Sequence, residues 1–397
     1  MTPPVDDQEP YVGGAAVRRT ERLVLAEDYW GYDPYDALCS PLFRLPVLRR
    51  RLPRRAAQQL LRRLPFNPRP LLGIAKGQNP VTLGLALQAW SLLATVSENE
   101  RSRYASEAER LVARLDELRS PGWSGACWGY DFAWETRDTT FPRFTPTVVA
   151  TGFVTHGLFT AHVRLGTPGA IELCESACSF VRNDLHRTPG PEGSFCWSYS
   201  PLDTGRVLNA TAKGSRLLVE VASARGREDL LADARASLAY VVRHQRPDGS
   251  WPYAVDDPRS WADNFHTGYV LDALAAYTEH AEDSELSRAI ESGWRYYRRH
   301  FFENGWVPRY YDTSLYPIDS TAVAQAMITL CRFGDVETAS RIAAWSAATM
   351  QRADGGFIYR RGRHVVNRVQ YMRWSTVWML VGLATVLTAQ HGVADRG

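Results

Sequence analysis

Short apolar segments built around a threonine recur six times along this chain of 397 residues. Successive copies lie 54 to 69 residues apart, and their threonines are Thr82, Thr151, Thr211, Thr267, Thr321 and Thr376. A spacing of this kind is typical of repeat architectures, in which each unit buries its apolar face against the next. The repeat therefore restricts the possible folds more than any other feature of the chain.

A second set of segments alternates with the apolar ones. Residues 228–244 and 287–302 carry apolar side chains at helical spacing, with charged residues on the opposite face. Each such segment runs into a turn of glycine and an aromatic residue, as at Gly249 to Trp251. Each unit thus has one nearly uncharged helix and one amphipathic helix. This composition suits two concentric rings, in which the inner helices are buried on both faces and the outer helices have one face in water. We therefore predict an all-α fold, an (α/α)6 toroid of six helical hairpins.

Charge is unevenly distributed along the chain. The net charge is only +3, but residues 37–97 contain ten Lys and Arg and no Asp or Glu. We expect a polar N-terminal lead-in at residues 1–36, a basic amphipathic helical segment at 37–79 and the toroid at 80–397. Leu and Arg interleave in residues 42–74, which indicates either peripheral contact with a membrane or a solvated basic face packed on the acidic remainder. No nucleic-acid partner is expected, because no motif for one is present.

The cysteines, the first residues and the longest apolar run indicate in which cellular compartment the protein is found. Six cysteines are scattered without a CxxC pair, and the first residues lack the layout of a secretion signal. The longest apolar run, Val377 to Ala389, is short for a membrane span and fits a buried helix. We expect a cytoplasmic protein, peripheral at the inner membrane face if the basic segment binds lipid.

One outer segment resembles a known motif. Residues Arg235 to Trp251 match every position of the QW repeat of squalene–hopene-type cyclases, and Gln351 to Phe357 is a degenerate copy. In this motif the Gln side chain can bond backbone groups at the end of the outer helix, while the aromatic ring packs over the turn. The resemblance covers most of residues 80 to 390 and implies the toroid superfamily of terpenoid cyclases and protein prenyltransferases.

Two shorter stretches resemble functional motifs of the same superfamily. Tyr316 to Ala322 resembles the DxDDTA motif of class II terpene cyclases, whose proton-donating Asp falls on Asp319, although Pro317 and Ser320 stand where that family has acids. Asp263 to Tyr269 resembles the stretch of prenyltransferase β-subunits that supplies a zinc-ligating His.

Metal and cofactor needs follow from these two stretches. The zinc-ligating His falls on His266, but the other two ligands have no equivalent, so no metal site is expected. No DDxxD run is present. We expect no cofactor, except Mg²⁺ if the substrate is a diphosphate.

Aligning the apolar segments on their threonines brings four residues to one equivalent position: Asn209, Phe265, Asp319 and Trp374. The inner helices of a closed toroid all run the same way, so these residues should gather at one rim of the central cavity. Polar groups within an apolar, aromatic ring are the usual signature of a binding site.

The candidate catalytic residues have alternative interpretations. Asp319 is either an acid whose pKa burial raises, or an N-cap whose pKa the helix dipole lowers. His266 is a proton relay, a base, a lone metal ligand or simply a hydrogen-bonded rim residue, and Asp263 assists it or caps the helix. Tyr316 and Tyr311 are hydroxyls that act as acids or orient Asp319.

Candidate substrate-binding residues are mostly aromatic. Their faces stabilise carbocations or stack on sugar rings, unless they only pack the core. They are Trp128, Tyr130, Trp134, Trp261, Phe265, Tyr269, Tyr311 and Trp374, together with Asn209. Arg309 and Arg373, with Arg137 and Arg143, are candidates for binding a diphosphate or a carboxylate.

The leading functional hypothesis is an isoprenoid cyclase-like enzyme of secondary metabolism acting on a hydrophobic polyprenyl substrate. Asp319 would start the reaction by protonation, and His266 with Asp263 would remove a proton. The alternative is a glycan-active (α/α)6 enzyme, either hydrolase, lyase or uronyl C5-epimerase, that uses the same rim residues. A non-catalytic toroid that binds lipid or peptide is the third possibility.

Overall fold

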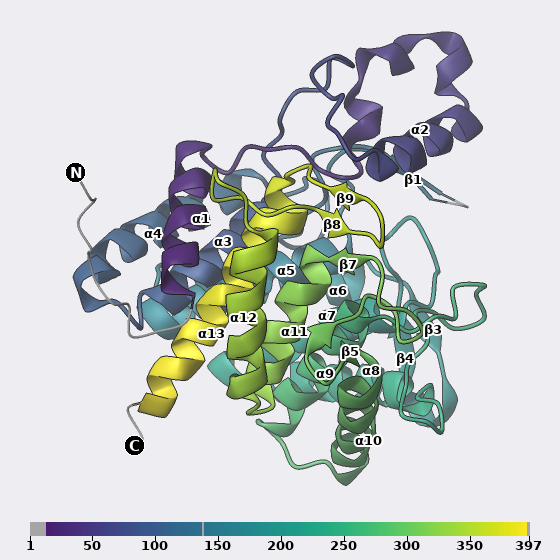
Figure 1. The fold of residues 1–397 in the computed structure, drawn as a ribbon. Helices are drawn as coiled ribbons and strands as arrows, with labels where there is room; N and C mark the ends of the chain where they lie inside the picture. The colour runs from purple at the N-terminus through teal and green to yellow at the C-terminus, as the bar shows by residue number, and fades with distance from the viewer. Residues whose placement is uncertain (1–12, 137–138, 395–397) are drawn as a thin grey trace.

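The computed structural model describes residues 13–136 and 139–394, and its centre is a ring of six helices. Each inner helix packs against the next, and the last packs against the first, so the ring is closed (Figure 1). The inner helices are α3 (Pro80–Leu93), α5 (Val148–Leu165), α7 (Leu208–Arg225), α9 (Asn264–Thr278), α11 (Ser320–Arg332) and α13 (Trp378–Ala394). The predicted all-α (α/α)6 toroid is confirmed.

The outer ring consists of helices with one buried face. Five of them follow their inner partner in the chain: α4 (Arg101–Glu117), α6 (Ala170–Asn183), α8 (Glu228–Arg243), α10 (Ser284–His300) and α12 (Val336–Met350). The sixth comes from the other end of the chain, because α1 (Gly14–Ala26) packs against α13. In α10 the buried residues recur at helical spacing, for example Leu286, Ala289 and Gly293, while the charged residues face outward.

The glycine-aromatic turns fasten neighbouring outer helices to one another. The Gln245 side-chain amide donates to the carbonyl oxygens of Gly249 at 3.0 Å and of Ala289, in α10, at 2.9 Å. The Trp251 indole N–H donates to the Val241 carbonyl at 3.1 Å. The Gln245 side chain thus links one outer helix to the next. The QW-like repeat therefore stabilises the toroid and does not indicate a particular reaction.

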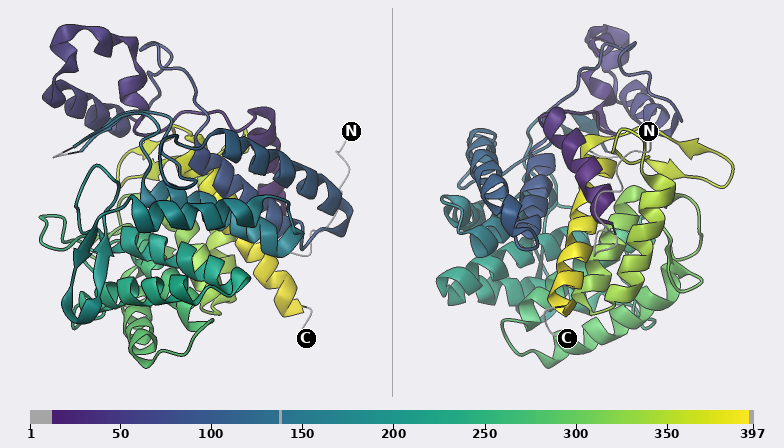
Figure 2. Two further views of the ribbon diagram at one scale, coloured as in Figure 1. Left: turned by 180° about the vertical axis from the view of Figure 1, so that it is seen from behind. Right: turned by 60° about the vertical axis from the view of Figure 1, so that its left-hand side comes forward.

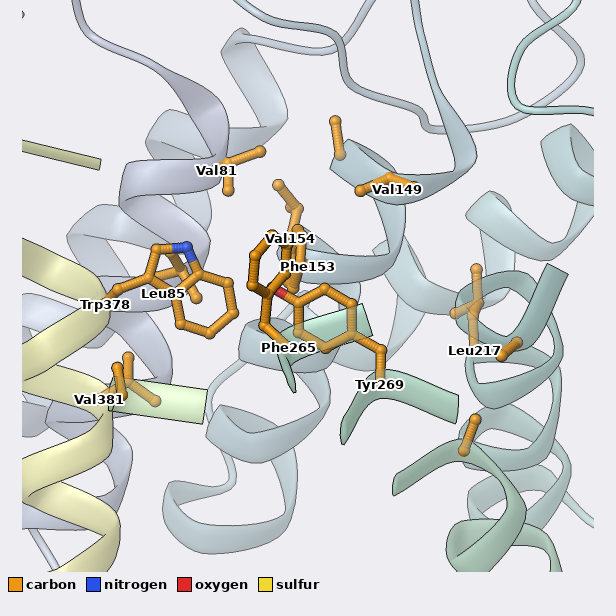
Figure 3. Close-up of a cluster of buried hydrophobic side chains, with 14 of the residues drawn as sticks. Val81, Leu85, Val149, Phe153, Val154, Leu217, Phe265, Tyr269, Trp378 and Val381 are labelled. Carbon is orange, nitrogen blue, oxygen red and sulfur yellow. The ribbon is translucent and has the colours of Figure 1, made fainter. Parts of the chain in front are cut away.

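The inner helices bury both faces, and large side chains fill the barrel axis. Phe153, Tyr269 and Trp378 pack edge-to-face or stacked, with ring centroids 5.0 to 6.0 Å apart. Figure 3 shows these three rings and Phe265 turned toward one another from α5, α9 and α13. The apolar stretch Met372–Gly392 is long enough to cross a membrane by length and composition, but 78% of its apolar window is buried inside the protein. Its apolarity is explained by its place in the core.

All inner helices begin at one rim, and the loops that lead into them contain short strands. Three strands form one sheet in the order β7-β8-β9, with Asp319 paired to Arg360 across β7 and β8. The strands are β1 (Trp134–Glu135), β2 (Thr140–Phe141), β3 (Arg187–Pro189), β4 (Phe195–Trp197), β5 (Phe302–Glu303), β6 (Val307–Pro308), β7 (Ile318–Asp319), β8 (Arg360–Arg361) and β9 (Val366–Asn367). These loops position the polar residues of the rim.

Residues 40–73, which we call the basic arm, project from the rim beyond the barrel (Figures 1 and 2). The arm consists of two proline-initiated 3-10 turns, Pro41–Arg44 and Pro46–Arg49, and helix α2 (Arg51–Arg63). It is tied to the rim loops at its base. Arg54 pairs with Glu135 at 2.6 Å, and the Asn367 amide donates to the Leu64 carbonyl at 2.7 Å.

Candidate functional site

The rim contains a carboxylate–imidazole pair at the start of α9. Asp263 is the N-cap, and its Oδ1 accepts a hydrogen bond from the backbone N–H of His266 at 2.9 Å. Its Oδ2 lies 2.7 Å from Nδ1 of the same histidine. A buried carboxylate in this place fixes the proton on Nδ1 and leaves Nε2 as an acceptor. Nε2 has no hydrogen-bond partner among the residues that the structure describes. The pair therefore has the geometry of an oriented general base.

A small cleft opens beside this imidazole. Its wall includes Asn209, Tyr253, Trp261 and Thr267, in addition to Asp263 and His266. The side-chain N–H₂ of Asn209 is buried and has no hydrogen-bond partner within the described part of the chain. Buried donors are nearly always satisfied, so an orphaned one in a cleft calls for an external acceptor. The wall of the cleft thus contains a buried donor without a partner and an open acceptor.

Two aromatic rings form one side of the same cleft. Trp261 is 40% exposed and stacks on Tyr253, with ring centroids 5.6 Å apart and an angle of 22° between the planes. The Tyr253 ring also packs edge-on against the imidazole of His266 at 4.8 Å. An exposed indole face next to polar groups gives both an apolar surface and hydrogen bonding. Such a platform suits the flat C–H face of a pyranose ring.

Asp319 serves a structural role at the start of α11. It is fully buried, and its Oδ1 caps the helix by accepting from the backbone N–H of Thr321 at 2.9 Å. Its Oδ2 accepts from Nε of Arg360 at 2.5 Å, and the Trp374 indole N–H donates to the same carboxylate at 3.2 Å. An N-cap and a guanidinium both stabilise the ionised form of a carboxyl. Asp319 thus has the contacts of a helix N-cap that also holds a guanidinium.

A second buried ion pair lies on the same rim. Arg373 Nε donates to Asp33 Oδ2 at 2.6 Å, and its guanidinium lies over the rings of Tyr130 and Trp374 at 4.9 and 5.1 Å. Because Asp33 already neutralises it, Arg373 is not a free anion-binding group. Phe265 packs edge-on against Trp374 at 6.2 Å. Three of the four residues predicted to share one rim position, Phe265, Asp319 and Trp374, are thus brought together, and Arg373 lies beside Trp374.

Other predicted site residues lie outside the cleft at His266. Trp128 is fully buried, and its indole donates to the Leu115 carbonyl at 2.8 Å, so it packs the core below the rim. Trp134 stacks on Phe141 at 4.5 Å, and Tyr269 lies in the aromatic layer on the axis.

The remaining predicted residues lie in the loops before α11, in the loop before α5, or outside the described residues. Arg309 pairs with Glu303, and Tyr311 packs on Tyr310 at 4.6 Å. Tyr316 is 41% exposed, with its carbonyl accepting a hydrogen bond from the Ser314 hydroxyl. Arg143 donates to the Asp131 carbonyl at 2.8 Å. Arg137 lies outside the described residues.

Several rim residues carried no sequence signal. Tyr253 lies two residues after the Gly249–Trp251 turn, and its ring packs against that of His266. Asp131 accepts from the Asn79 amide at 2.7 Å, and burial, assisted by the charge of Asp33, raises the pKa of Asp131 to about 6. Its proximity to the aromatic residues 128–134 was the one clue available. Across residues 13–136 and 139–394, no group of three or more His, Cys, Asp or Glu is placed to hold a metal ion.

A separate polar cluster lies deeper inside the barrel. The Lys213 ammonium sits over the rings of Phe153 and Tyr269, 3.9 and 4.1 Å from their centroids. Burial and the charge of Arg216 lower the pKa of Lys213 to about 7, against the opposing effect of Asp272. Aromatic rings separate this lysine from the rim.

The lower part of the cluster joins α5 to α7. His156 Nδ1 lies 2.7 Å from Glu220, and Nε of Arg216 donates to the same carboxylate oxygen at 2.9 Å. Burial lowers the pKa of His156 despite this carboxylate. These contacts satisfy one another, so they hold the two inner helices together.

Comparison with known proteins shows what the fold resembles. No family model and no curated protein sequence matches the chain. Among solved structures, a family GH76 α-mannanase from Bacteroides thetaiotaomicron matches with a TM-score of 0.59 at 10% identity, over 79% of this chain and 87% of that one. The unsaturated glucuronyl hydrolase of Bacillus sp. GL1 matches with a TM-score of 0.58 at 14% identity, over 96% of both chains. The cellobiose 2-epimerase of Spirochaeta thermophila matches with a TM-score of 0.58 at 9% identity, over 80% and 87%.

These matches correct two predictions made from the sequence. The resemblance to terpenoid cyclases and prenyltransferases is wrong as an assignment, because the three matching structures reported above are a mannanase, a glucuronyl hydrolase and a cellobiose epimerase. The isoprenoid cyclase function, with its polyprenyl substrate and its place in secondary metabolism, is wrong for the same reason. The error has a physical cause. The QW-like turn stabilises the packing of neighbouring outer helices, and Asp319 caps α11 and pairs with Arg360.

Proposed function

We propose that the protein is a glycan-active enzyme in which His266 acts as a general base on a sugar bound at the rim. Asp263 orients the imidazole, and Asn209 donates a hydrogen bond to an oxygen of the substrate. Trp261, backed by Tyr253, stacks on the sugar ring. The observation that carries the proposal is the free Nε2 of His266 in a cleft that also holds an orphaned donor and an exposed aromatic face.

The chemistry that this arrangement favours is abstraction of a carbon-bound proton, as in epimerisation or β-elimination. A neutral imidazole with a lone pair on Nε2 can take such a proton, and a nearby donor can stabilise the developing oxyanion. Two rim carboxylates, Asp33 and Asp319, each hold an arginine. They are therefore poorly suited to serve as the acid of a hydrolase.

Hydrolysis is the second candidate function, because the pKa of Asp131 is raised. A carboxyl with its pKa raised to about 6 can remain protonated near neutral pH and donate its proton to a leaving oxygen. This role requires Asp131 to meet the substrate from the opposite side of the rim. The type of product decides between the two candidates.

The test is a panel of oligosaccharides that contain mannose, glucose or uronic acid, incubated with the protein in deuterated water. Proton abstraction places deuterium at a sugar carbon or creates an unsaturated uronate that absorbs in the ultraviolet, whereas hydrolysis releases new reducing ends. His266→Ala should reduce turnover by roughly 10²- to 10⁴-fold, the usual contribution of a general base. The matched control is His280→Ala, because His280 is exposed just past the opposite end of the same helix. Equal activity of the two variants would exclude His266 as the base.

A further inference from the structure

Large apolar side chains are concentrated on the surface of the basic arm. Across the described residues, 13 large hydrophobic side chains are exposed, and seven of them fall between residues 42 and 71. Their exposed fractions run from 46% to 91%, and they are Leu42, Leu45, Val47, Leu52, Leu60, Phe66 and Leu71. Isolated apolar residues on a surface are ordinary, but a contiguous group marks a docking surface.

The same arm carries cations without ionic partners. Arg54, Arg62 and Arg69 are held by Glu135, Tyr35 and Asp36 at the base of the arm. Five other arginines form no ion pair within the described ranges: Arg44, Arg49, Arg50, Arg55 and Arg63. The stretch that follows up to residue 97 contains no acidic residue that could neutralise them. The surface is therefore both apolar and strongly positive.

The arm projects beyond the rim, and the rest of the described chain contacts it only at its base, where Gln58 accepts a hydrogen bond from the Glu135 backbone N–H. Figures 1 and 2 show α2 and the turns before it projecting beyond the rim in each view. Within α2 only Gln58 and Leu61 are buried, which leaves Leu52 and Leu60 exposed on the outer side with Arg63, while Arg55 is half-buried. A helix that keeps leucines in water beside arginines lacks the partner that its composition requires.

We propose that the basic arm docks the protein on an anionic lipid surface. The leucines and Phe66 enter the boundary between headgroups and acyl chains, and the unpaired guanidiniums bind lipid phosphates. A nucleic acid would use the arginines but leave seven apolar side chains in water. A protein partner would need an apolar groove to receive them with acidic residues around it. A bilayer with anionic headgroups satisfies both sets of side chains over a projecting, convex surface. This proposal is independent of the chemistry at His266.

The experiment is co-sedimentation of the full chain with vesicles of phosphatidylcholine alone or with about a third of phosphatidylglycerol. We expect at least tenfold tighter binding to the anionic vesicles, and most of this preference should disappear in high salt because the charges are screened. The triple variant Arg49→Gln/Arg50→Gln/Arg55→Gln should bind them about a hundredfold more weakly, since each cation contributes about one further factor of five. The triple variant Leu52→Ser/Leu60→Ser/Phe66→Ser should lose at least tenfold on both kinds of vesicle.

The matched control is Val163→Ser/Leu202→Ser, which removes exposed apolar side chains far from the arm in sequence and should leave binding unchanged. Thermal unfolding of every variant checks that the barrel is intact, because all the substituted side chains are exposed or half-buried. Absence of binding by the wild type, or equal binding by both arm variants and the control, overturns the proposal. Sedimentation velocity provides a further outcome. A dimer that the serine variant converts to monomer, without vesicle binding by the wild type, would identify a second copy as the partner instead of lipid and also overturn it.

Discussion

Nε of Arg360 donates a hydrogen bond to Oδ2 of Asp319 at 2.5 Å, joining strand β8 to the first turn of α11. The carboxylate is fully buried and also caps the helix. The pair links the C-terminal sheet of the rim to the inner ring. Its importance is therefore structural, and stability is the property to measure.

Asp319→Asn should lower the free energy of unfolding by about 3–5 kcal/mol, because it leaves the Arg360 guanidinium without its anion. The control is Asp354→Asn, which breaks the half-exposed pair with Arg352 at 2.8 Å and should change stability by less than about 1 kcal/mol. Denaturant unfolding measures both. Equal effects would mean that burial adds nothing to the Asp319 pair.

Asp263→Asn should separate capping from orientation of the His266 ring. An amide oxygen can still cap α9, so the stability should stay within about 1 kcal/mol of wild type. The same side chain cannot also hold Nδ1–H as a carboxylate does, so kcat/KM on the active sugar should fall at least tenfold. Asp263→Ala should lose both properties. A fall in activity only in proportion to lost stability would argue that the aspartate is merely a cap.

Lys213 should give the folded protein a pH-dependent stability. The folded-state pKa is lowered to about 7, whereas an unfolded lysine titrates near 10.4. Between these values the unfolded chain binds more protons, so the free energy of unfolding should rise as the pH increases from 7 to 10. Below pH 7 the buried charge is fully unfavourable.

Lys213→Met should therefore stabilise the protein at pH 6 by a few kcal/mol, less the lost cation–π contact, and should remove this rise. The chain has one other lysine, Lys76, which pairs with Glu27 on the surface and provides the control Lys76→Met. Denaturant unfolding at pH 6, 8 and 10 measures the effect. A wild-type slope that persists in Lys213→Met would assign it to another group.

Gly355 should be essential for attaching α1 to the outer ring. Its φ is +91°, and a Cβ there would lie 2.2 Å from the Arg19 carbonyl oxygen of α1. Gly334 has a similar φ of +81° but open space around a built Cβ. Gly334→Ala should cost about 1–2 kcal/mol from backbone strain alone, and Gly355→Ala should cost at least about 2 kcal/mol more from the clash. Thermal unfolding compares the stability of the two variants. Equal losses of stability would mean that α1 shifts to make room for the added Cβ at no energetic cost.

The periodicity of the apolar segments predicted the toroid, and the alignment on Thr267 and its equivalents predicted which residues share the rim. Both predictions depend on the local pattern of apolar residues, because a helix that is buried on two faces must be apolar around its circumference. The same reasoning led to the wrong function. The QW-like turn and the Asp319 motif resemble motifs of terpene cyclases and so favoured a cyclase. Each motif, however, hydrogen-bonds backbone groups that any toroid of this kind must satisfy.

The repeated apolar segments were enough to predict six inner helices and the rim on which polar residues gather, but not that α1, in the expected lead-in, supplies the sixth outer helix. Which of those residues are free to act depends on contacts that form only in the folded ring. Arg360 and Asp33 come from distant parts of the chain and neutralise Asp319 and Arg373, whereas His266 keeps one nitrogen open beside Asn209 and Trp261. The reason is physical: helical periodicity is set by neighbours a few residues apart, but the charge and hydrogen bonding of a buried group depend on partners brought together when the ring closes.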